Sequence, residues 1–192
     1  MQSNGAMEFD AVVLAGGASR RFDGADKARF ELGGRSLLER AVDAVGSAGR
    51  VIVVGPRRPL VRDVTWVQES PPGAGPAHAL AAGLELVGAD HVAVLACDLP
   101  FAGREIVERL VAAVGSSDGA VVRDGSLRPQ PLLAVYRTAA LRSRLGGRIT
   151  RNAPVREVIG DLKLKYMTDD LAATGCDTPE ALRQMETMFS KD

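Results

Sequence analysis

Residues 14–27 bring together residue types that bind phosphate. Gly16 and Gly17 follow a short apolar run, and glycine lets main-chain N–H groups turn toward an anion. Arg20, Arg21 and Lys27 come a few residues later. An arginine fork grips oxygens in pairs, whereas a lysine acts as a point charge. The pattern predicts a phosphate-binding turn, with an ordinary strand-to-loop connection as the alternative.

This turn differs from the two commonest phosphate loops. It lacks the G-x-x-x-x-G-K-[ST] of a P-loop and the G-x-G-x-x-G of a dinucleotide-binding turn. The chain also has no convincing Ser-His-Asp, Cys-His or paired-carboxylate pattern. This absence agrees with catalysis by positioning and charge neutralisation. A phosphate group that attacks another phosphate is already anionic, so no general base has to remove a proton from it.

Asp98 is the second candidate for chemistry. It follows the apolar run 91–96, and ligands of open α/β sheets bind outside the carboxyl ends of the strands. A carboxylate at that edge, facing a phosphate loop, suits Mg²⁺, which prefers oxygen ligands. The alternative is a turn or a helix cap before Pro100.

A proline- and glycine-rich loop at residues 69–76 is the third candidate. Gly73 and Gly75 permit close approach, and Pro76 stands near the first turn of a predicted helix. Unpaired N–H groups at such a helix start can bind a ligand, although a stiff turn explains the composition equally well. His78, inside this segment, is interpreted as structural or solvent-exposed.

The elements that must position these residues alternate between buried strands and helices. Continuous apolar runs predict strands and three-to-four spacing predicts helices. The resulting fold class is α/β, with a single doubly wound, mostly parallel sheet and flanking helices. Strands are predicted at 11–14, 50–54, 64–67, 91–96, 120–122, 132–136 and 162–167, a short hairpin at 28–34, helices at 37–45, 104–114, 139–145 and 154–159 and from Pro76 and Pro179, and a polar loop at 123–131.

Composition excludes several classes of function. Apolar residues make up 46% and charged residues 25% of the 192, with a net charge of zero. The sequence shows no basic stripe and has few aromatic side chains, which argues against nucleic-acid binding. The short basic clusters at Arg20-Arg21 and Arg57-Arg58 are assigned to small anions or solvent. No segment is long and apolar enough for a membrane span, and no export signal opens the chain.

The remaining features place the chain as one domain. Cys97 and Cys176 lack metal spacing, which favours reduced thiols and a cytoplasmic location. We expect residues 1–6 to be a leader or a disordered start. Residues 7–192 are expected to form a single domain.

Two motifs carry a family resemblance. L-A-G-G-x-S-x-R-x-x-G-x-D-K at residues 14–27 resembles the signature of the MobA-like nucleotidyltransferases, most of all the molybdenum cofactor guanylyltransferases. A-C-D-L-P-F at residues 96–101 resembles the family's Mg²⁺-binding motif. The resemblance implies a Rossmann-like fold of the nucleotide-diphospho-sugar transferase type. It also implies transfer of GMP from GTP to a phosphorylated pterin, molybdopterin, with release of pyrophosphate.

The resemblance also assigns roles to residues of this chain. Arg21, Lys27 and Asp98 would be catalytic, and Asp98 and Asp177 would hold Mg²⁺. Arg123, Arg128 and Gln130 are candidates for holding an anionic acceptor, with solvated loop charges as the alternative, and the basic loop 148–154 could reach over it. Transient contacts with other cofactor-biosynthesis or molybdoenzyme proteins are expected. The nucleotide-binding set would be Leu14, Ala15, Gly16, Gly17, Lys27, Glu69, Gly75 and Asp98.

Three positions depart from the family pattern. Glu69 stands where relatives usually have Asp, Gly175 where they often have Asn, and Asp23 where they often have Gly. Two other hypotheses therefore remain open. One is a related enzyme that uses CTP or GTP with another phosphorylated acceptor, and the other is a nucleotide-binding regulator without catalysis.

Overall fold

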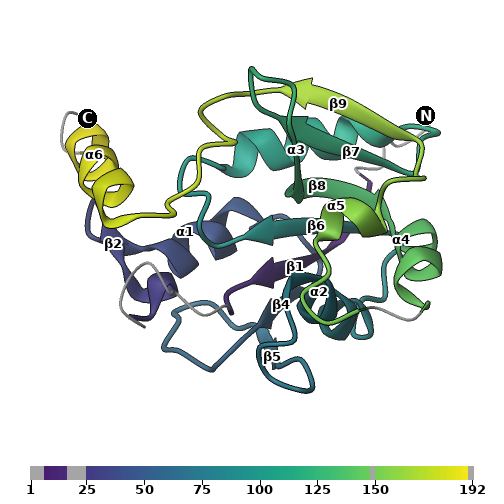
Figure 1. The fold of residues 1–192 in the computed structure, drawn as a ribbon, viewed down its shortest axis with the longest axis horizontal. Helices are drawn as coiled ribbons and strands as arrows, with labels where there is room; N and C mark the ends of the chain where they lie inside the picture. Colours follow the sequence, from purple (N-terminus) through teal and green to yellow (C-terminus); the bar gives the residue numbers. More distant parts are fainter. Residues whose placement is uncertain (1–6, 17–24, 148–149, 190–192) are drawn as a thin grey trace, which may run out of the picture.

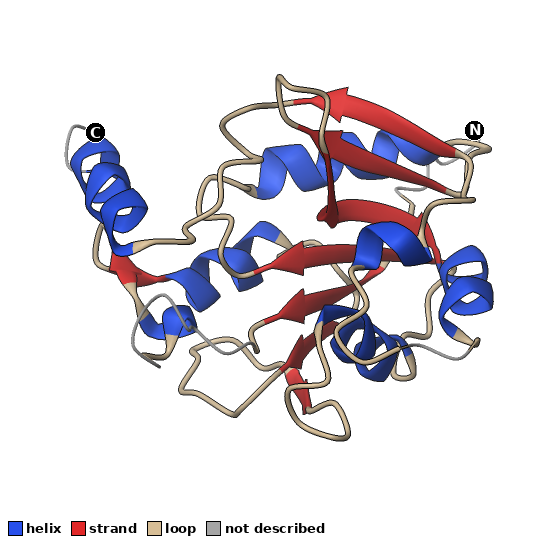
Figure 2. Ribbon diagram, in the orientation of Figure 1, coloured by secondary structure: helices blue, strands red, loops and turns tan. Residues whose placement is uncertain are grey.

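A seven-stranded sheet runs through the computed structural model, which describes residues 7–16, 25–147 and 150–189 (Figures 1 and 2). All of its strands are parallel except β8, which is antiparallel to both of its neighbours. The predicted α/β fold with a mostly parallel sheet is therefore confirmed. The order across the sheet is β5 (Thr65–Val67), β4 (Val51–Val54), β1 (Asp10–Leu14), β6 (His91–Ala96), β8 (Pro129–Arg137), β7 (Gly119–Arg123) and β9 (Leu164–Thr168).

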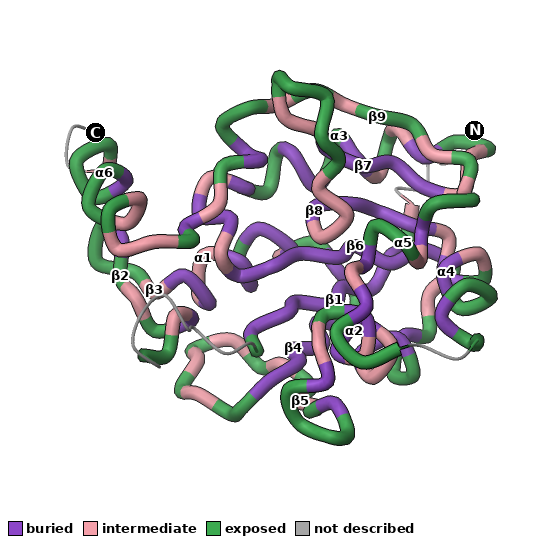
Figure 3. The backbone as a smooth tube through the Cα atoms, in the orientation of Figure 1, coloured by how far each residue is buried: buried purple, intermediate pink, exposed green. Residues whose placement is uncertain are grey.

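Helices cover both faces of this sheet. Successive side chains of a strand point to opposite faces, so Val12 and Val13 of β1 enter two different core clusters, each fully buried. The Val13 face packs against α1 (Leu37–Ala44) and α3 (Arg104–Val114). The Val12 face packs against α2 (Pro76–Leu84), α4 (Thr138–Leu145) and α5 (Val155–Val158). The central strands are consequently buried on both sides (Figure 3).

The segment before the reversed strand corrects one prediction. The polar loop expected through residue 131 ends earlier, because β8 already begins at Pro129. β6 pairs with β8 only over residues 133–137, so Pro129 and Pro131 lie beyond the end of β6 and need no N–H on that side. On the other side β7 stays paired with this part of β8, after a register shift between Val121 and Val122.

The predicted hairpin forms, but it is shorter than expected. Strands β2 (Glu31–Leu32) and β3 (Arg35–Ser36) pair antiparallel. The residues before them form the 3₁₀ turn η2 (Lys27–Arg29), closed by Phe30 N–H donating to the Lys27 carbonyl at 3.1 Å, instead of an extended strand. Ser36 caps α1 in a capping box with Glu39.

The C-terminal helix α6 (Pro179–Phe189) lies beside β2, away from the sheet (Figure 1). It encloses a small third core around Leu32, Leu37, Cys176 and Met185. Thr178 caps the helix, because its hydroxyl accepts a hydrogen bond from Ala181 N–H at 3.1 Å. In the described part of the chain no helix has the length and apolar character needed to cross a membrane.

Candidate active site

Lys27 joins two carboxylates from distant parts of the chain. Its Nζ lies 3.0 Å from Asp98 Oδ2 and 2.8 Å from Asp177 Oδ1. The lysine side chain is 16% exposed, Asp98 is 32% exposed and Asp177 is 62% exposed. The cluster therefore opens to solvent on the Asp177 side, where a ligand can enter. Three residues that the sequence analysis selected separately thus meet at one point.

Strand ends and one backbone hydrogen bond create this convergence. Asp98 follows the carboxyl end of β6, next to the end of β1, where Cys97 N–H donates to the Leu14 carbonyl at 3.0 Å. Cys176 N–H donates to the Asp98 carbonyl at 2.8 Å, which places the neighbouring Asp177 beside Asp98. A parallel sheet presents its strand ends, and the side chains that follow them, at a common edge.

Gly175, one of the departures from the family pattern, lies against this cluster. A Cβ at this position would stand 3.3 Å from Asp177 Oδ2, closer than most Cβ contacts in proteins. The glycine therefore leaves room for the Asp177 carboxylate in its bond to Lys27.

The β1 turn is described only as far as Gly16. Ala15 continues the ladder, its N–H donating to the Val54 carbonyl at 2.9 Å, and Leu14 and Ala15 are buried. A Cβ on Gly16 would make only ordinary contacts of 3.7 Å with the protein. Gly55 is the tighter position: its φ is 143°, and a Cβ there would lie 3.0 Å from the Ala15 carbonyl.

Several sequence predictions fall outside the described residues. They concern residues 1–6 and the phosphate-turn residues Gly17, Arg20, Arg21 and Asp23, together with Arg148 of the basic loop.

In the 69–76 loop, Glu69 and Gly75 make contacts within the protein. Glu69 is buried, and its Oε1 accepts a hydrogen bond from Gly73 N–H at 2.9 Å. Gly75 has a φ of 109°, and a Cβ on it would lie 2.7 Å from the Cα of Asn152. Asn152 N–H in turn donates to the Ala74 carbonyl at 2.7 Å. The contact with Asn152 was not predicted, because no sequence pattern links loops so far apart.

The side chains of two acceptor candidates, Arg123 and Gln130, already have protein partners. Arg123 donates from Nε to Thr168 Oγ1 at 2.9 Å. Gln130 Nε2 donates to the carbonyl of Ala173, in the segment that leads to Asp177, at 3.1 Å. Arg128 donates its backbone N–H to Asp124 at 2.9 Å. Gln130 is thus tied to the chain around the Lys27 cluster, whereas Arg123 binds β9.

One ion pair corrects the sequence analysis. Arg58, which we assigned with Arg57 to small anions or solvent, forms a bidentate pair with Asp26, at 2.6 Å from Nε to Oδ2 and 2.7 Å from Nη2 to Oδ1. Its side chain is only 10% exposed. Sequence inspection missed the pair because its members are 32 positions apart in two different loops.

Comparison with known proteins places this chain in a family. The model of the MobA-like NTP transferase domain matches residues 11–165, most of the chain. This chain belongs to the MobA-like NTP transferase family. It is accordingly a nucleotidyltransferase.

Individual relatives agree with this assignment. A molybdenum cofactor guanylyltransferase from Shewanella sp. MR-4 is 31% identical over 139 residues, 69% of this chain and 70% of that protein. Another, from Shewanella putrefaciens, is 28% identical over 193 residues and covers 96% of this chain and 95% of its own length. The crystal structure of molybdopterin-guanine dinucleotide biosynthesis protein A from Archaeoglobus fulgidus superposes with a TM-score of 0.74 at 22% identity, covering 95% of this chain and all of that one. That likeness shows the shared fold.

Electrostatics keep the central lysine of the candidate site charged. Burial alone would lower the pKa of Lys27, but the nearby Asp98 and Asp177 carboxylates outweigh it and raise the pKa above its ordinary value. Lys27 is therefore a permanent ammonium. Cys97, beside the cluster, is the opposite case: burial, reinforced by Asp98, raises the pKa of its thiol to about 12, so it is no nucleophile.

The donor set fits a divalent cation. Carboxylate oxygens of Asp98 and Asp177 both bind the Lys27 ammonium, so the two carboxylates lie close together and a divalent ion would bind through their other oxygens. Mg²⁺ is commonly held by one or two carboxylates together with substrate phosphates. Among the described residues there is no cluster of three or more His, Cys, Asp or Glu that would form an all-protein metal cage. The site thus suits an ion that arrives with a nucleotide.

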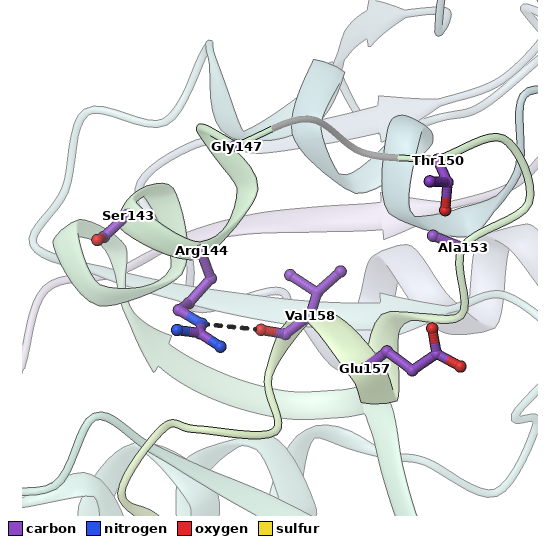
Figure 4. Close-up of a pocket in the computed structure, with 7 residues that line it drawn as sticks. All are labelled: Ser143, Arg144, Gly147, Thr150, Ala153, Glu157 and Val158. Carbon is purple, nitrogen blue, oxygen red and sulfur yellow. Dashed lines mark hydrogen bonds between the residues drawn. The ribbon is translucent and has the colours of Figure 1, made fainter.

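A separate pocket lies between α4 and α5 (Figure 4). It shares no residue with the Lys27 cluster, and Arg144 within it is occupied by the Val158 carbonyl at 3.1 Å from Nε. We assign it no part in the chemistry of the family. It is lined by Ser143, Arg144, Gly147, Thr150, Ala153, Glu157 and Val158.

Proposed function

We propose that this chain transfers GMP from GTP to the phosphate of molybdopterin, or of its molybdenum-loaded form, and releases pyrophosphate. Family membership and the activity named for its curated relatives support this substrate pair. The observation that carries the proposal is the meeting of Lys27, Asp98 and Asp177 at the carboxyl ends of the strands. A metal-bound triphosphate requires a positive group for its phosphates, which the ammonium supplies, and negative groups for its metal ion, which the two carboxylates supply.

In this proposal Asp98, with Asp177 beside it, holds Mg²⁺. The bound ion would neutralise charge on the phosphate oxygens. Lys27 offsets the negative charge that grows on the leaving pyrophosphate, and Arg21 is predicted to do the same. The acceptor phosphate is already anionic, so no side chain has to remove a proton from it.

The nucleotide would lie along the β1 turn. Leu14, Ala15, Gly16 and Gly17 are the proposed backbone contacts. The Ala15 N–H already donates to the Val54 carbonyl, so the N–H groups that approach a phosphate would be those of the two glycines. Glu69 and Gly75 remain the predicted contacts to the base. In this structure Glu69 binds Gly73 N–H, so contact with guanine would use its second carboxylate oxygen or a rearranged loop.

We further propose that residues 7–192 act as one domain in the cytoplasm. The family match to residues 11–165 supports the domain, and α6 extends it by packing against the β2–β3 hairpin. Transient contacts with other cofactor-biosynthesis or molybdoenzyme proteins remain a prediction.

Calorimetric binding of GTP, CTP, ATP and UTP, with and without Mg²⁺, tests this proposal, followed by a molybdopterin transfer assay. We expect GTP to bind best and to need Mg²⁺. Asp98→Asn should lower turnover about 100-fold or more, since it removes a charge that the transition state requires. Asp161→Asn is the control, because Asp161 is an exposed aspartate paired with Arg144.

Each other outcome contradicts a defined part of the proposal. Preference for CTP would overturn the substrate, and binding without transfer to any acceptor would favour a regulator. Full turnover in Asp98→Asn would remove the assigned role of Asp98.

A further inference from the structure

The Arg58–Asp26 pair is the best-formed ion pair near the site. Both carboxylate oxygens of Asp26 are held by one guanidinium group, at 2.6 and 2.7 Å. Arg58 is itself fixed, because its Nη1 donates to the Pro56 carbonyl at 2.9 Å and its side chain is 10% exposed. A bidentate arginine pair defines a direction as well as a distance.

Asp26 directly precedes Lys27. Its carboxylate is held by Arg58 and its carbonyl accepts Arg29 N–H at 3.0 Å. On the other side of Lys27, Ala28 is buried at 2% exposure. The backbone of Lys27 is thus held from both sides. A lysine side chain is a flexible four-carbon stem, so a fixed Cα, together with the two carboxylates, keeps its ammonium at a defined point.

Arg58 comes from the loop between β4 and β5, which lies against the residues at the end of β1. Gly55 in this loop approaches the Ala15 carbonyl so closely that a Cβ would stand 3.0 Å away. The charges then alternate from Arg58 through Asp26 and Lys27 to the carboxylates of Asp98 and Asp177. The Arg58–Asp26 pair therefore connects the β4–β5 loop, beside the end of β1, with Lys27.

We propose that Arg58 and Asp26 are positioning residues that aim the Lys27 ammonium at the phosphates of the bound nucleotide. This inference rests on the proposed function, in which Lys27 acts on those phosphates. The alternative is an ion pair that only stabilises the β4–β5 loop. The two differ in one respect: a positioning pair acts on catalysis only through Lys27.

A double-mutant cycle on turnover separates these alternatives. Arg58→Met should lower kcat about tenfold with less change in KM for the nucleotide, and Arg58→Lys should rescue little because it lacks the fork. In a Lys27→Met background, Arg58→Met should cause no further loss, since its effect passes through Lys27. Arg144→Met, which breaks the remote pair with Asp161, is the control with unchanged kcat.

Chemical labelling of lysines gives a second readout that needs no activity. The sequence has four lysines, and Lys163 and Lys165 are exposed internal references for acetic anhydride labelling measured by mass spectrometry. In the wild type Lys27 should react slowly, because it is bound to two carboxylates. Arg58→Met should raise its labelling several-fold relative to the references, and Arg144→Met should not.

Loss of stability is controlled by neutralising both partners. Arg58→Met alone leaves an unpaired carboxylate, whereas Asp26→Leu with Arg58→Met removes both charges and should recover much of the melting temperature. Lys27 labelling should remain raised in that double variant. Additive effects in the cycle, or Lys27 labelling that returns to normal with stability, would overturn the positioning role. A wild type that labels as expected but transfers no nucleotide would contradict only the proposed function.

Discussion

At the residue scale, the candidate site depends on a few side chains that the fold brings together over long distances. Lys27 meets Asp98 across 71 positions and Asp177 across 150. Their residue types explain the result, because an ammonium between two carboxylates stabilises all three charges in a partly buried place. Glu69 shows the opposite, since its buried carboxylate serves the loop that follows it.

We predict that Glu69→Ala destabilises the protein by about 1–2 kcal/mol, because Gly73 N–H loses its acceptor. Glu69→Gln keeps an oxygen at the same place and should stay close to the wild type. Urea unfolding of the two variants measures the difference, with the exposed Glu85→Ala as control. A Glu69→Ala variant as stable as the wild type would show that this bond contributes nothing in solution.

At the element scale, the loops at the carboxyl ends of the strands fit each other through glycines. Gly55 lets the end of β4 approach the β1 turn, and Gly75 lets the start of α2 approach Asn152. Gly83 within α2 has the same use, since a Cβ there would lie 2.6 Å from Val12 of β1. Small residues at these positions decide how closely a helix or loop can lie on the sheet.

Comparing Gly75→Ala with Gly73→Ala tests this fit. Both glycines have positive φ, 109° and 74°, but only Gly75 faces a backbone atom, whereas Gly73 faces open space. We expect a loss of about 1 kcal/mol for Gly73→Ala and about 3 kcal/mol or more for Gly75→Ala, measured by urea unfolding. Equal losses of stability in the two variants would mean that the loop around Asn152 moves away from the added methyl group without destabilising the protein.

At the scale of the whole molecule, the site lies between the sheet and a small separate core. Asp98 belongs to the sheet edge, and Asp177 belongs to the segment that enters α6. The third core fixes this segment through Cys176 and Met185, and through Phe101 and Phe189, whose rings stack 5.0 Å apart. Loosening α6 would therefore move Asp177 without unfolding the sheet.

We predict that Met185→Ala increases proteolysis within α6 and lowers nucleotidyl transfer, because it leaves a cavity in this small core. The global melting temperature should change little, since the two sheet cores stay intact. Limited proteolysis and the transfer assay measure these effects. Met188→Ala is the matched control, as Met188 is 50% exposed on the same helix. Loss of sheet structure in Met185→Ala, seen by circular dichroism, would contradict this independence.

The sequence by itself determined the fold class, most element positions and the residues of the candidate cluster. Buried strands and amphipathic helices follow from local apolar patterns, and each pattern can be recognised within about ten residues of sequence. Lys27 and Asp98 could be selected from residue type and position, beside a glycine turn and at a strand end, whereas Asp177 was selected only through the family resemblance. The start of β8 at Pro129 escaped this reasoning, because it depends on where β6 ends.

Only the tertiary structure decided which of these residues meet. The Arg58–Asp26 pair, the approach of Asn152 to Gly75 and the contact of Cys176 N–H with the Asp98 carbonyl all join separate loops. Sequence patterns report the preference of a chain segment for strand, helix or turn. Contacts between loops depend instead on the order and packing of the whole sheet, which no single segment encodes.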